Sequence, residues 1–306
     1  MSGKMNLIDC IGNTPLVRLD NYGKGIDANI YAKLEMFNPF SIKDRPALYM
    51  IVEAEKRGDI DSNSTIIEAS SGNTAIALAM ICSSKGYRLI ICMSEIQSKE
   101  RRNVLRAYGA ELVLTPAEFG TKGAKNKAIE LSESIENSLY ICQHSNRDNI
   151  TAHYETTGPE LWNDTDGKID VLVCGLGTTG TAMGVANRIK PLKSSFKVIG
   201  VEPRESPFLK EGIFHPHRMM GTAPGWKPDL YNEDNIDDIF LVSESEAFNA
   251  CRELIRDEGI IAGITSGATA FAAREISRQH EYQGLHIVAM FADSGERYLS
   301  VEGLFD

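Results

Sequence analysis

The chain has 306 residues, of which 42% are hydrophobic and 24% are charged, and this composition excludes wholesale disorder. Its 32 Lys and Arg against 42 Asp and Glu give a net charge of −10, so it lacks the excess of cations that non-specific nucleic-acid binding needs. The length corresponds to about two domains of roughly 150 residues each. The apolar runs are shorter than the roughly 20 residues of a membrane span, and the first residues show no export or transit pattern. We therefore expect a cytoplasmic protein without membrane or nucleic-acid partners.

Short apolar runs alternate with amphipathic stretches along the whole chain. The runs rich in Val and Ile predict strands at 29–34, 65–69, 88–93, 111–115, 139–143, 170–175, 197–201, 239–242 and 285–291. Between them the spacing of apolar residues predicts helices, among them 44–57 and 99–108, and Ser243 with Glu246 forms a capping box. Because the strands are apolar on both faces, the pattern predicts an α/β fold of mostly parallel sheets flanked by helices. Residues 203–238 have no clear period and predict a long, functional loop.

The six cysteines and the histidines give no pattern of a metal or disulfide framework. No two cysteines have C-x-x-C spacing, and most lie inside apolar runs, which is typical of free, buried thiols in a reduced compartment. His215 and His217 are close in sequence, but no neighbouring Cys or Glu completes a ligand set. We predict no metal and place this pair on a surface loop.

A glycine turn follows the predicted strand at 170–175. Gly175, Gly177 and Gly180 spell G-x-G-x-x-G, and Glu202 follows at the end of the next strand, a spacing typical of dinucleotide binding. The same turn is rich in hydroxyls at a helix start, which suits a single terminal phosphate. A plain connecting turn is the third interpretation. The residues of this turn alone leave all three open.

Other turns join strands or loops to helix starts. In NPFSIKDR (38–45), Lys43 stands at a helix N-terminus. A cation is unfavourable there, so this position lowers the pKa of the lysine, as Schiff-base chemistry needs. EASSGNTA (68–75) brings small hydroxyls and N–H groups to a helix start, which suits a carboxylate. GITSGATA (263–270) and ADSGERYL (292–299) follow later strands. Taken singly, each of these turns is also explained as a helix cap or connecting turn.

These motifs, in this order, resemble those of the cysteine synthase family. Two further segments share the resemblance, IGNTPLVRL (11–19) and TTGPELW (156–162). The members of this family are fold-type II pyridoxal-phosphate (PLP) enzymes related to O-acetylserine sulfhydrylase, cystathionine β-synthase and the tryptophan synthase β chain. The likeness covers nearly the whole chain. It implies two α/β domains, a small movable one at 44–142 that carries the substrate loop and a large one formed by 1–43 with 143–306. In this family the glycine turn holds the phosphate of the cofactor.

The resemblance also implies roles for single residues. Lys43 matches the lysine that binds PLP as a Schiff base and then moves protons. Asn73 matches the residue that hydrogen-bonds the ring hydroxyl, and Thr265 matches the one beside the pyridine nitrogen. The implied phosphate loop is Gly177, Thr178, Thr179, Gly180 and Thr181. The implied positions for the amino-acid carboxylate are Ser70, Ser71, Thr74 and Gln143, and Gly221 lies near a glycine of the active-site loop.

The implied activity is β-replacement on an O-activated L-serine resembling O-acetylserine. It proceeds through an aminoacrylate, with sulfide addition giving L-cysteine, in a homodimer. The chain departs from the common pattern at Phe40, which alone separates Asn-Pro from Ser-Ile-Lys, at Thr179, where glycine is usual, and in MMGTAPGW (219–226). The last two departures concern the substrate side and leave alternatives. These are an O-phosphoserine-using synthase of a non-protein amino acid, like that of the siderophore diaminopropionate branch, or a cysteine β-lyase or cystathionine β-synthase-type activity that releases H2S. An NAD-dependent dehydrogenase is a remote alternative, and Lys43 argues against a catalytically idle partner.

Overall fold

The computed structural model describes residues 5–306. Packing divides the chain into two compact units. Unit 1 comprises Lys43–Asn149 with residues 5–11, and unit 2 comprises Gly12–Ile42 with Ile150–Asp306. The division expected from the sequence was 44–142 against 1–43 with 143–306. It differs from these units because residues 5–11, Lys43 and residues 143–149 belong to unit 1. That the smaller part moves on substrate binding stays a prediction.

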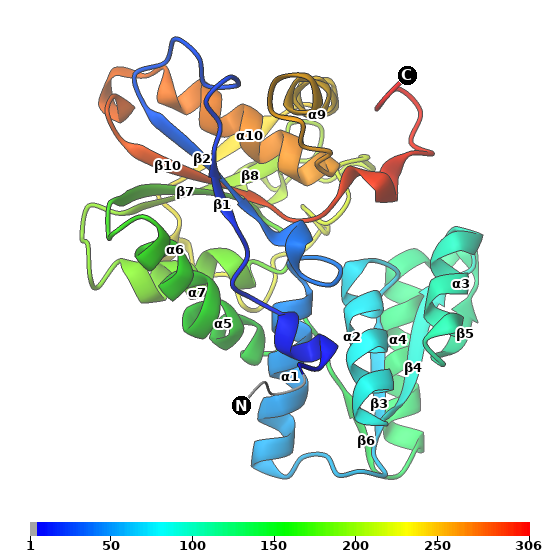
Figure 1. Ribbon diagram of the computed structural model, residues 1–306. Helices are drawn as coiled ribbons and strands as arrows, with labels where there is room; N and C mark the ends of the chain where they lie inside the picture. The colour runs from blue at the N-terminus through cyan, green and yellow to red at the C-terminus, as the bar shows by residue number, and fades with distance from the viewer. Residues whose placement is uncertain (1–4) are drawn as a thin grey trace. The chain divides into compact units, whose positions relative to one another are not determined.

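Unit 1 is built on a four-stranded sheet in the order β5-β4-β3-β6, in which every pair of neighbours is parallel (Figure 1). Its strands are β3 (Thr65–Ala69), β4 (Arg88–Ser94), β5 (Glu111–Thr115) and β6 (Ser138–Tyr140). Its helices are α1 (Asp44–Arg57), α2 (Asn73–Lys85), α3 (Lys99–Ala107) and α4 (Gly120–Ser134). The path from β3 to β4 runs one way along the sheet and the path from β5 to β6 runs the other way. Because such crossovers are right-handed, α2 and α4 cover opposite faces.

Helix α2 is apolar almost all round because it is covered on several sides. Every residue from Thr74 to Cys82 is buried, and the helix packs against α1 as well as against β3 and β4. Glycines end these helices in the left-handed conformation: Gly58 follows α1 and Gly86 follows α2, as expected for helix C-termini.

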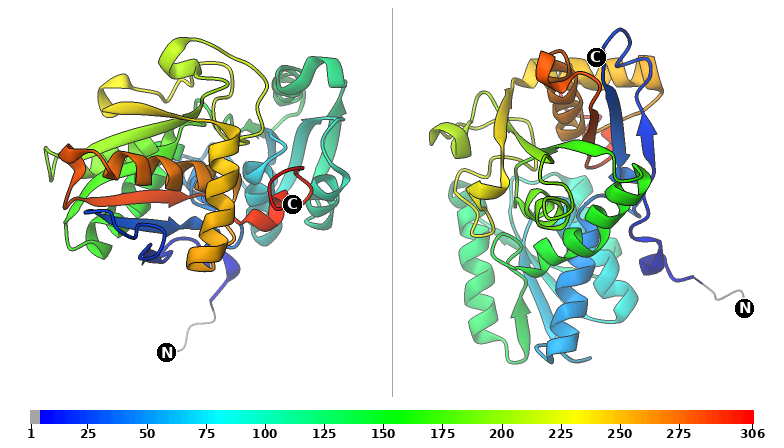
Figure 2. Two further views of the ribbon diagram at one scale, coloured as in Figure 1. Left: turned by 90° about the horizontal axis from the view of Figure 1, so that it is seen from above. Right: turned by 90° about the vertical axis from the view of Figure 1, so that its left-hand side faces the viewer.

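Unit 2 contains a six-stranded sheet in the order β1-β2-β10-β7-β8-β9. Only the edge pair β1–β2 is antiparallel. The strands are β1 (Leu16–Arg18), β2 (Asn29–Leu34), β7 (Ile169–Gly175), β8 (Lys197–Pro203), β9 (Asp238–Val242) and β10 (His286–Phe291). The helices are α5 (Asp148–Ala152), which leads into the unit, the π-helix η4 (His153–Thr157), α6 (Gly158–Asp164), α7 (Gly180–Ile189), α8 (Phe208–Glu211), α9 (Glu244–Glu258) and α10 (Ile264–Ser277). Figures 1 and 2 show α7 and α10 on opposite faces of this sheet.

The central strand β7 shows why the predicted strands are apolar on both faces. Val171 and Val173 belong to the core cluster under α9 and α10. Leu172 and Cys174 belong to the cluster on the α7 face. Successive side chains of a strand point to opposite faces, and both faces of this sheet are covered by helices. This confirms the α/β fold with mostly parallel sheets.

The sequence-based elements are confirmed with two exceptions. Eight of the nine expected strands form within two residues of their predicted ends. The expected strand at 139–143 ends at Tyr140 instead, because the chain turns at Cys142, which has a φ of 51°. Strand β1 was not expected, since three residues at a sheet edge leave almost no periodic signal.

Three further predictions concern a helix cap, the cysteines and membrane-spanning helices. The Ser243–Glu246 capping box is present at the start of α9. Four cysteines are buried, Cys142 is half-buried and Cys10 is exposed, and none of the six, all within residues 5–306, forms a disulfide bond. No helix among residues 5–306 is long and apolar enough to cross a bilayer.

Candidate active site

The first group of predicted site residues lies in unit 1, where β3 runs into α2. The chain leaves β3 at Ala69, passes through Ser70, Ser71 and Gly72, and enters α2 at Asn73. Gly72 occupies the N-cap position and has no side chain to satisfy the first N–H groups of the helix. Residues 70–73 are half-buried. This helix start therefore offers N–H groups and hydroxyls to an anion.

Gln143 reaches the same helix start from the turn after β6. The Thr74 hydroxyl Oγ1 donates to Gln143 Oε1 at 2.7 Å, and both side chains are buried. Because the amide oxygen of Gln143 accepts this bond, its NH₂ group points its donors elsewhere. The structure thus brings together two residues that are far apart in sequence and were predicted for one site. Their binding of a substrate carboxylate stays a prediction.

Lys43 lies at the N-cap position of α1 and its side chain forms no cap hydrogen bond. It is half-buried, whereas Asp44 and Arg45 after it are fully buried. Helix α1 packs directly against α2, the helix that carries Asn73 and Thr74. The lysine therefore lies at the start of a helix whose first turn is fixed by buried neighbours.

The second group lies in unit 2, in the turn between β7 and α7. Thr179 adopts a left-handed conformation with a φ of 67°, which is unusual for a threonine. Its hydroxyl oxygen is buried and has no hydrogen-bond partner among the described residues. A buried polar atom without a protein partner keeps its hydrogen-bonding capacity for a ligand or a water molecule. The turn precedes a helix of ten residues, whose N-terminus favours an anion.

The backbone of this turn is packed so closely that side chains are excluded. A Cβ on Gly177 would lie 2.1 Å from the carbonyl oxygen of Gly221, and one on Gly175 would lie 2.7 Å from Cγ2 of Thr265. Gly221 itself has a φ of 95° and is exposed. The predicted residues Gly177, Gly221 and Thr265 thus surround one turn, although they come from three separate segments.

Thr265 is the second residue of α10 and is 8% exposed. Its hydroxyl donates to the carbonyl oxygen of Met220 at 2.9 Å. The N-cap of α10 is Gly263, so the alternative interpretation of Thr265 as a helix cap is wrong. Its position beside a pyridine nitrogen stays a prediction.

His153 is a buried residue of this site that the sequence analysis missed. Its Nε2 lies 3.2 Å from the Thr181 hydroxyl and its Nδ1 lies 2.9 Å from the Thr157 hydroxyl. His153 therefore orients the Thr181 hydroxyl of the 177–181 turn. The π-helix that carries it gives no distinct sequence pattern, and only the nearby TTGPELW motif marks the region.

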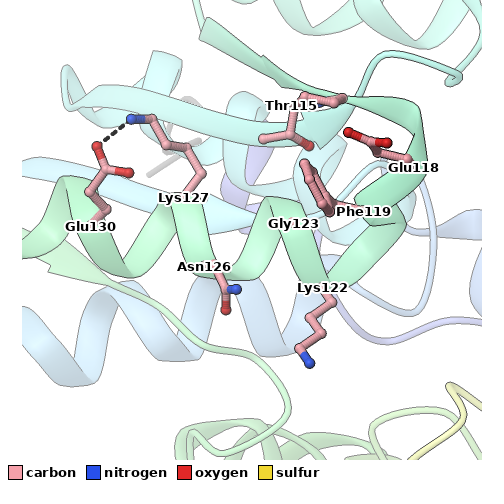
Figure 3. A pocket seen from close by; sticks show the side chains of 9 residues that line it. Thr115, Glu118, Phe119, Lys122, Gly123, Asn126, Lys127 and Glu130 are labelled. Carbon is pink, nitrogen blue, oxygen red and sulfur yellow. Dashed lines mark hydrogen bonds and ion pairs between the residues drawn. The ribbon is translucent and has the colours of Figure 1, made fainter.

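A groove of about 550 Å³ lies elsewhere in unit 1, along the start of α4 (Figure 3). It is lined by Thr115, Pro116, Glu118, Phe119, Lys122, Gly123, Asn126, Lys127 and Glu130. None of these residues belongs to the predicted site. Within the groove, Lys127 is paired with Glu130 (Figure 3).

Comparison with known proteins shows the family of the chain and its cofactor. Residues 7–293 match the family model described as pyridoxal-phosphate dependent enzyme. The chain belongs to this family. Its cofactor is therefore PLP, and the dinucleotide interpretation of G-x-G-x-x-G is not supported. The unpartnered Thr179 hydroxyl and the helix start behind it fit a phosphate group with several acceptor oxygens.

The similar proteins agree with the predicted resemblance. The cysteine synthase of Buchnera aphidicola subsp. Acyrthosiphon pisum (strain APS) is 43% identical over 302 residues, which cover 95% of each chain. The crystal structure of cysteine synthase (OASS) from Entamoeba histolytica has a TM-score of 0.95 at 36% identity and covers 99% of this chain and 91% of its own. A hydrogen sulfide-producing enzyme from Fusobacterium nucleatum has a TM-score of 0.91 at 44% identity, with coverages of 96% and 99%.

Replacing Ser71 or Gln143 by alanine should weaken amino-acid binding without loss of the cofactor. One hydrogen bond to a charged group contributes about 1.5–3 kcal/mol, which corresponds to roughly 10–100-fold in Kd. The measurement is the change in cofactor absorbance during titration with an amino acid, beside the PLP content of each variant. Ser84→Ala, at the exposed far end of α2, is the control and should behave like the parent. Equal loss of amino-acid binding and of PLP in Ser71→Ala or Gln143→Ala would mark the loop as a structural cap.

Proposed function

We propose that this protein is a cysteine synthase that uses an O-activated L-serine such as O-acetyl-L-serine. Sulfide takes the place of the acetyl-bearing oxygen at Cβ, and acetate leaves, so that L-cysteine and acetate form in equal amounts. The observation that carries the proposal is the 43% identity to a cysteine synthase over 95% of each chain. The two strand-to-helix turns, each suited to an anion, support the binding of an amino acid and of a phosphate-bearing cofactor.

The residues of the chain divide the work. When bound, PLP supplies the electron sink that stabilises the charge left on Cα. Lys43 anchors it and then moves the proton between its Nζ and the Cα of the substrate. Ser70, Ser71 and the amide group of Gln143 donate hydrogen bonds to the substrate carboxylate. The 177–181 turn binds the phosphate with its N–H groups and hydroxyls, and Asn73 binds the ring hydroxyl.

Thr265→Asp should lower β-replacement by at least about tenfold, whereas Thr265→Ser should retain most of it. A carboxylate beside the pyridine nitrogen raises the pKa of that nitrogen and changes the electron sink, while serine keeps a neutral hydroxyl. Thr265→Val is the control, because it removes the bond to the Met220 carbonyl without adding charge. Steady-state rates and absorbance spectra of the three variants give the comparison. An unchanged rate and spectrum in Thr265→Asp would show that this residue does not contact the ring nitrogen.

A second candidate function is β-elimination that releases H2S from L-cysteine. It is favoured by the 44% identity to the hydrogen sulfide-producing enzyme from Fusobacterium nucleatum. A mass-spectrometric screen separates the two. It offers O-acetylserine, O-phosphoserine, serine and cysteine as donors against sulfide, homocysteine and glutamate as acceptors. Fastest turnover of O-acetylserine with sulfide supports the synthase, and fastest loss of sulfide from cysteine alone supports the lyase.

We also propose that the protein works as a homodimer in the cytoplasm. The resemblance to the cysteine synthase family supports the dimer, and the free, mostly buried cysteines suit a reducing compartment. Sedimentation equilibrium tests the dimer: a mass twice the 33.7 kDa of the chain is expected, and a monomer would contradict it.

A further inference from the structure

Glu68 is a buried carboxylate that lies directly before the 70–74 loop. It is the second-last residue of β3 and is 1% exposed. A charged group at such a place costs free energy unless it is hydrogen-bonded. The groups that hydrogen-bond to this carboxylate therefore show which parts of the chain it stabilises.

The carboxylate of Glu68 joins the two segments that carry the predicted donors to substrate. Oε1 accepts the N–H of Ala69 at 2.8 Å, and Ala69 is the last residue of β3, immediately before the 70–74 loop. Oε2 accepts the Gln143 N–H at 3.3 Å, and the N–H of Cys142 also hydrogen-bonds to the carboxylate. Cys142 has a φ of 51°, so this carboxylate stabilises an uncommon turn conformation just before Gln143.

Opposing effects act on the pKa of the Glu68 carboxyl. Burial raises the pKa of its carboxyl to about 7, although the N–H groups of residues 69, 142 and 143 and the charge of Lys125 on α4 act in the opposite direction. The other titratable groups coupled to it are Cys92 on β4 and Tyr140 on β6, and burial raises the pKa of both, so both are neutral at pH 7. When Glu68 is protonated, the oxygen that carries the proton becomes a weaker acceptor, and its contact to one N–H weakens.

We propose that Glu68 is a positioning residue that holds the 70–74 loop and Gln143 in the one arrangement that binds a substrate carboxylate. This inference rests on the proposed function. It extends that function by naming a residue that acts through the backbone and does not contact the substrate. Amino-acid affinity then depends on the charge of Glu68, whereas cofactor retention does not.

The test is titration of the PLP-loaded parent and of Glu68→Gln with L-serine and with O-acetyl-L-serine, followed by cofactor absorbance at pH 6 and pH 8. At pH 8 the variant should bind at least about tenfold more weakly, with unchanged PLP content, because glutamine lacks the charged acceptor. At pH 6 the parent is mostly protonated, and the ratio of the two Kd values should fall severalfold, to about two. Comparing ratios cancels the titration of the substrate amino group. Glu111→Gln, an exposed carboxylate on β5, should match the parent.

Lys125→Met is a second variant that keeps Glu68 and lies outside the predicted site. Loss of this positive charge should raise the pKa of Glu68. The ratio of its Kd to that of the parent should then be near one at pH 9 and rise near pH 7. If Glu68→Gln binds amino acids like the parent at both pH values, or if both variants keep a constant Kd ratio across pH, the proposal fails. If the parent responds to no amino acid, the proposed function fails instead.

Discussion

Lys43→Ala should fold and should lose turnover by at least about 10²–10⁴-fold, the range of a single proton-transfer group. The substitution removes the only amine that we assign to both anchoring PLP and moving the Cα proton. Folding should persist because Lys43 is half-buried, whereas the residues that fix the first turn of α1, Asp44 and Arg45, are buried and unchanged. Lys56→Ala, an exposed lysine in the last turn of the same helix, is the matched control and should keep full activity.

Borohydride reduction of the PLP-loaded parent followed by peptide mapping checks the same assignment chemically. The pyridoxyl group is expected on the peptide that contains Lys43. Its recovery on another lysine, or full turnover of Lys43→Ala, would contradict the assignment.

Gly177→Ala should abolish stable retention of PLP, with a Kd raised by about two orders of magnitude. The new Cβ would lie 2.1 Å from the Gly221 carbonyl oxygen, and two backbone segments have no side-chain freedom with which to avoid this clash. Either the turn or the 219–222 segment must move, and the N–H groups then no longer converge on the phosphate. Such overpacking also costs about 1–3 kcal/mol of folding stability.

Gly86→Ala is the control for Gly177→Ala, because it separates a loss of folding stability from a loss of PLP retention. Gly86 has a φ of 83°, and a Cβ there meets nothing within 4 Å. This variant therefore carries left-handed strain of roughly 1 kcal/mol and no clash. It should unfold at a slightly lower temperature and retain PLP fully. Equal PLP retention by Gly177→Ala and Gly86→Ala in equilibrium dialysis would show that the 177–181 turn does not hold the phosphate.

The sequence predicts much of the fold because local patterns specify it. Helix α1 forms over the range its periodicity predicts, and the Ser243–Glu246 capping box starts α9. The prediction was wrong where local signal is weak or tertiary packing decides. Strand β1 has three residues, and the segment after Tyr140 turns away because it must present Gln143 to Thr74.

The site is harder to predict, because its geometry arises from contacts between distant segments. The motifs point to the 70–74 loop and to the glycine turn, but nothing in the sequence indicates that Gly177 packs on Gly221. The burial of the Glu68 side chain could not be predicted from the sequence either. As a glutamate at the end of an apolar strand it looks like a residue of the exposed turn, yet it is buried and joined to the backbone of Gln143.

The most direct test of the proposed cysteine synthase activity follows the sulfur atom. The PLP-loaded protein is incubated with O-acetyl-L-serine and sulfide labelled with a heavy sulfur isotope, and the products are quantified by mass spectrometry. We expect L-cysteine that carries the label, together with an equal amount of acetate, and no product from Lys43→Ala. Consumption of the donor to pyruvate and ammonia without labelled cysteine, or no consumption at all, would contradict it.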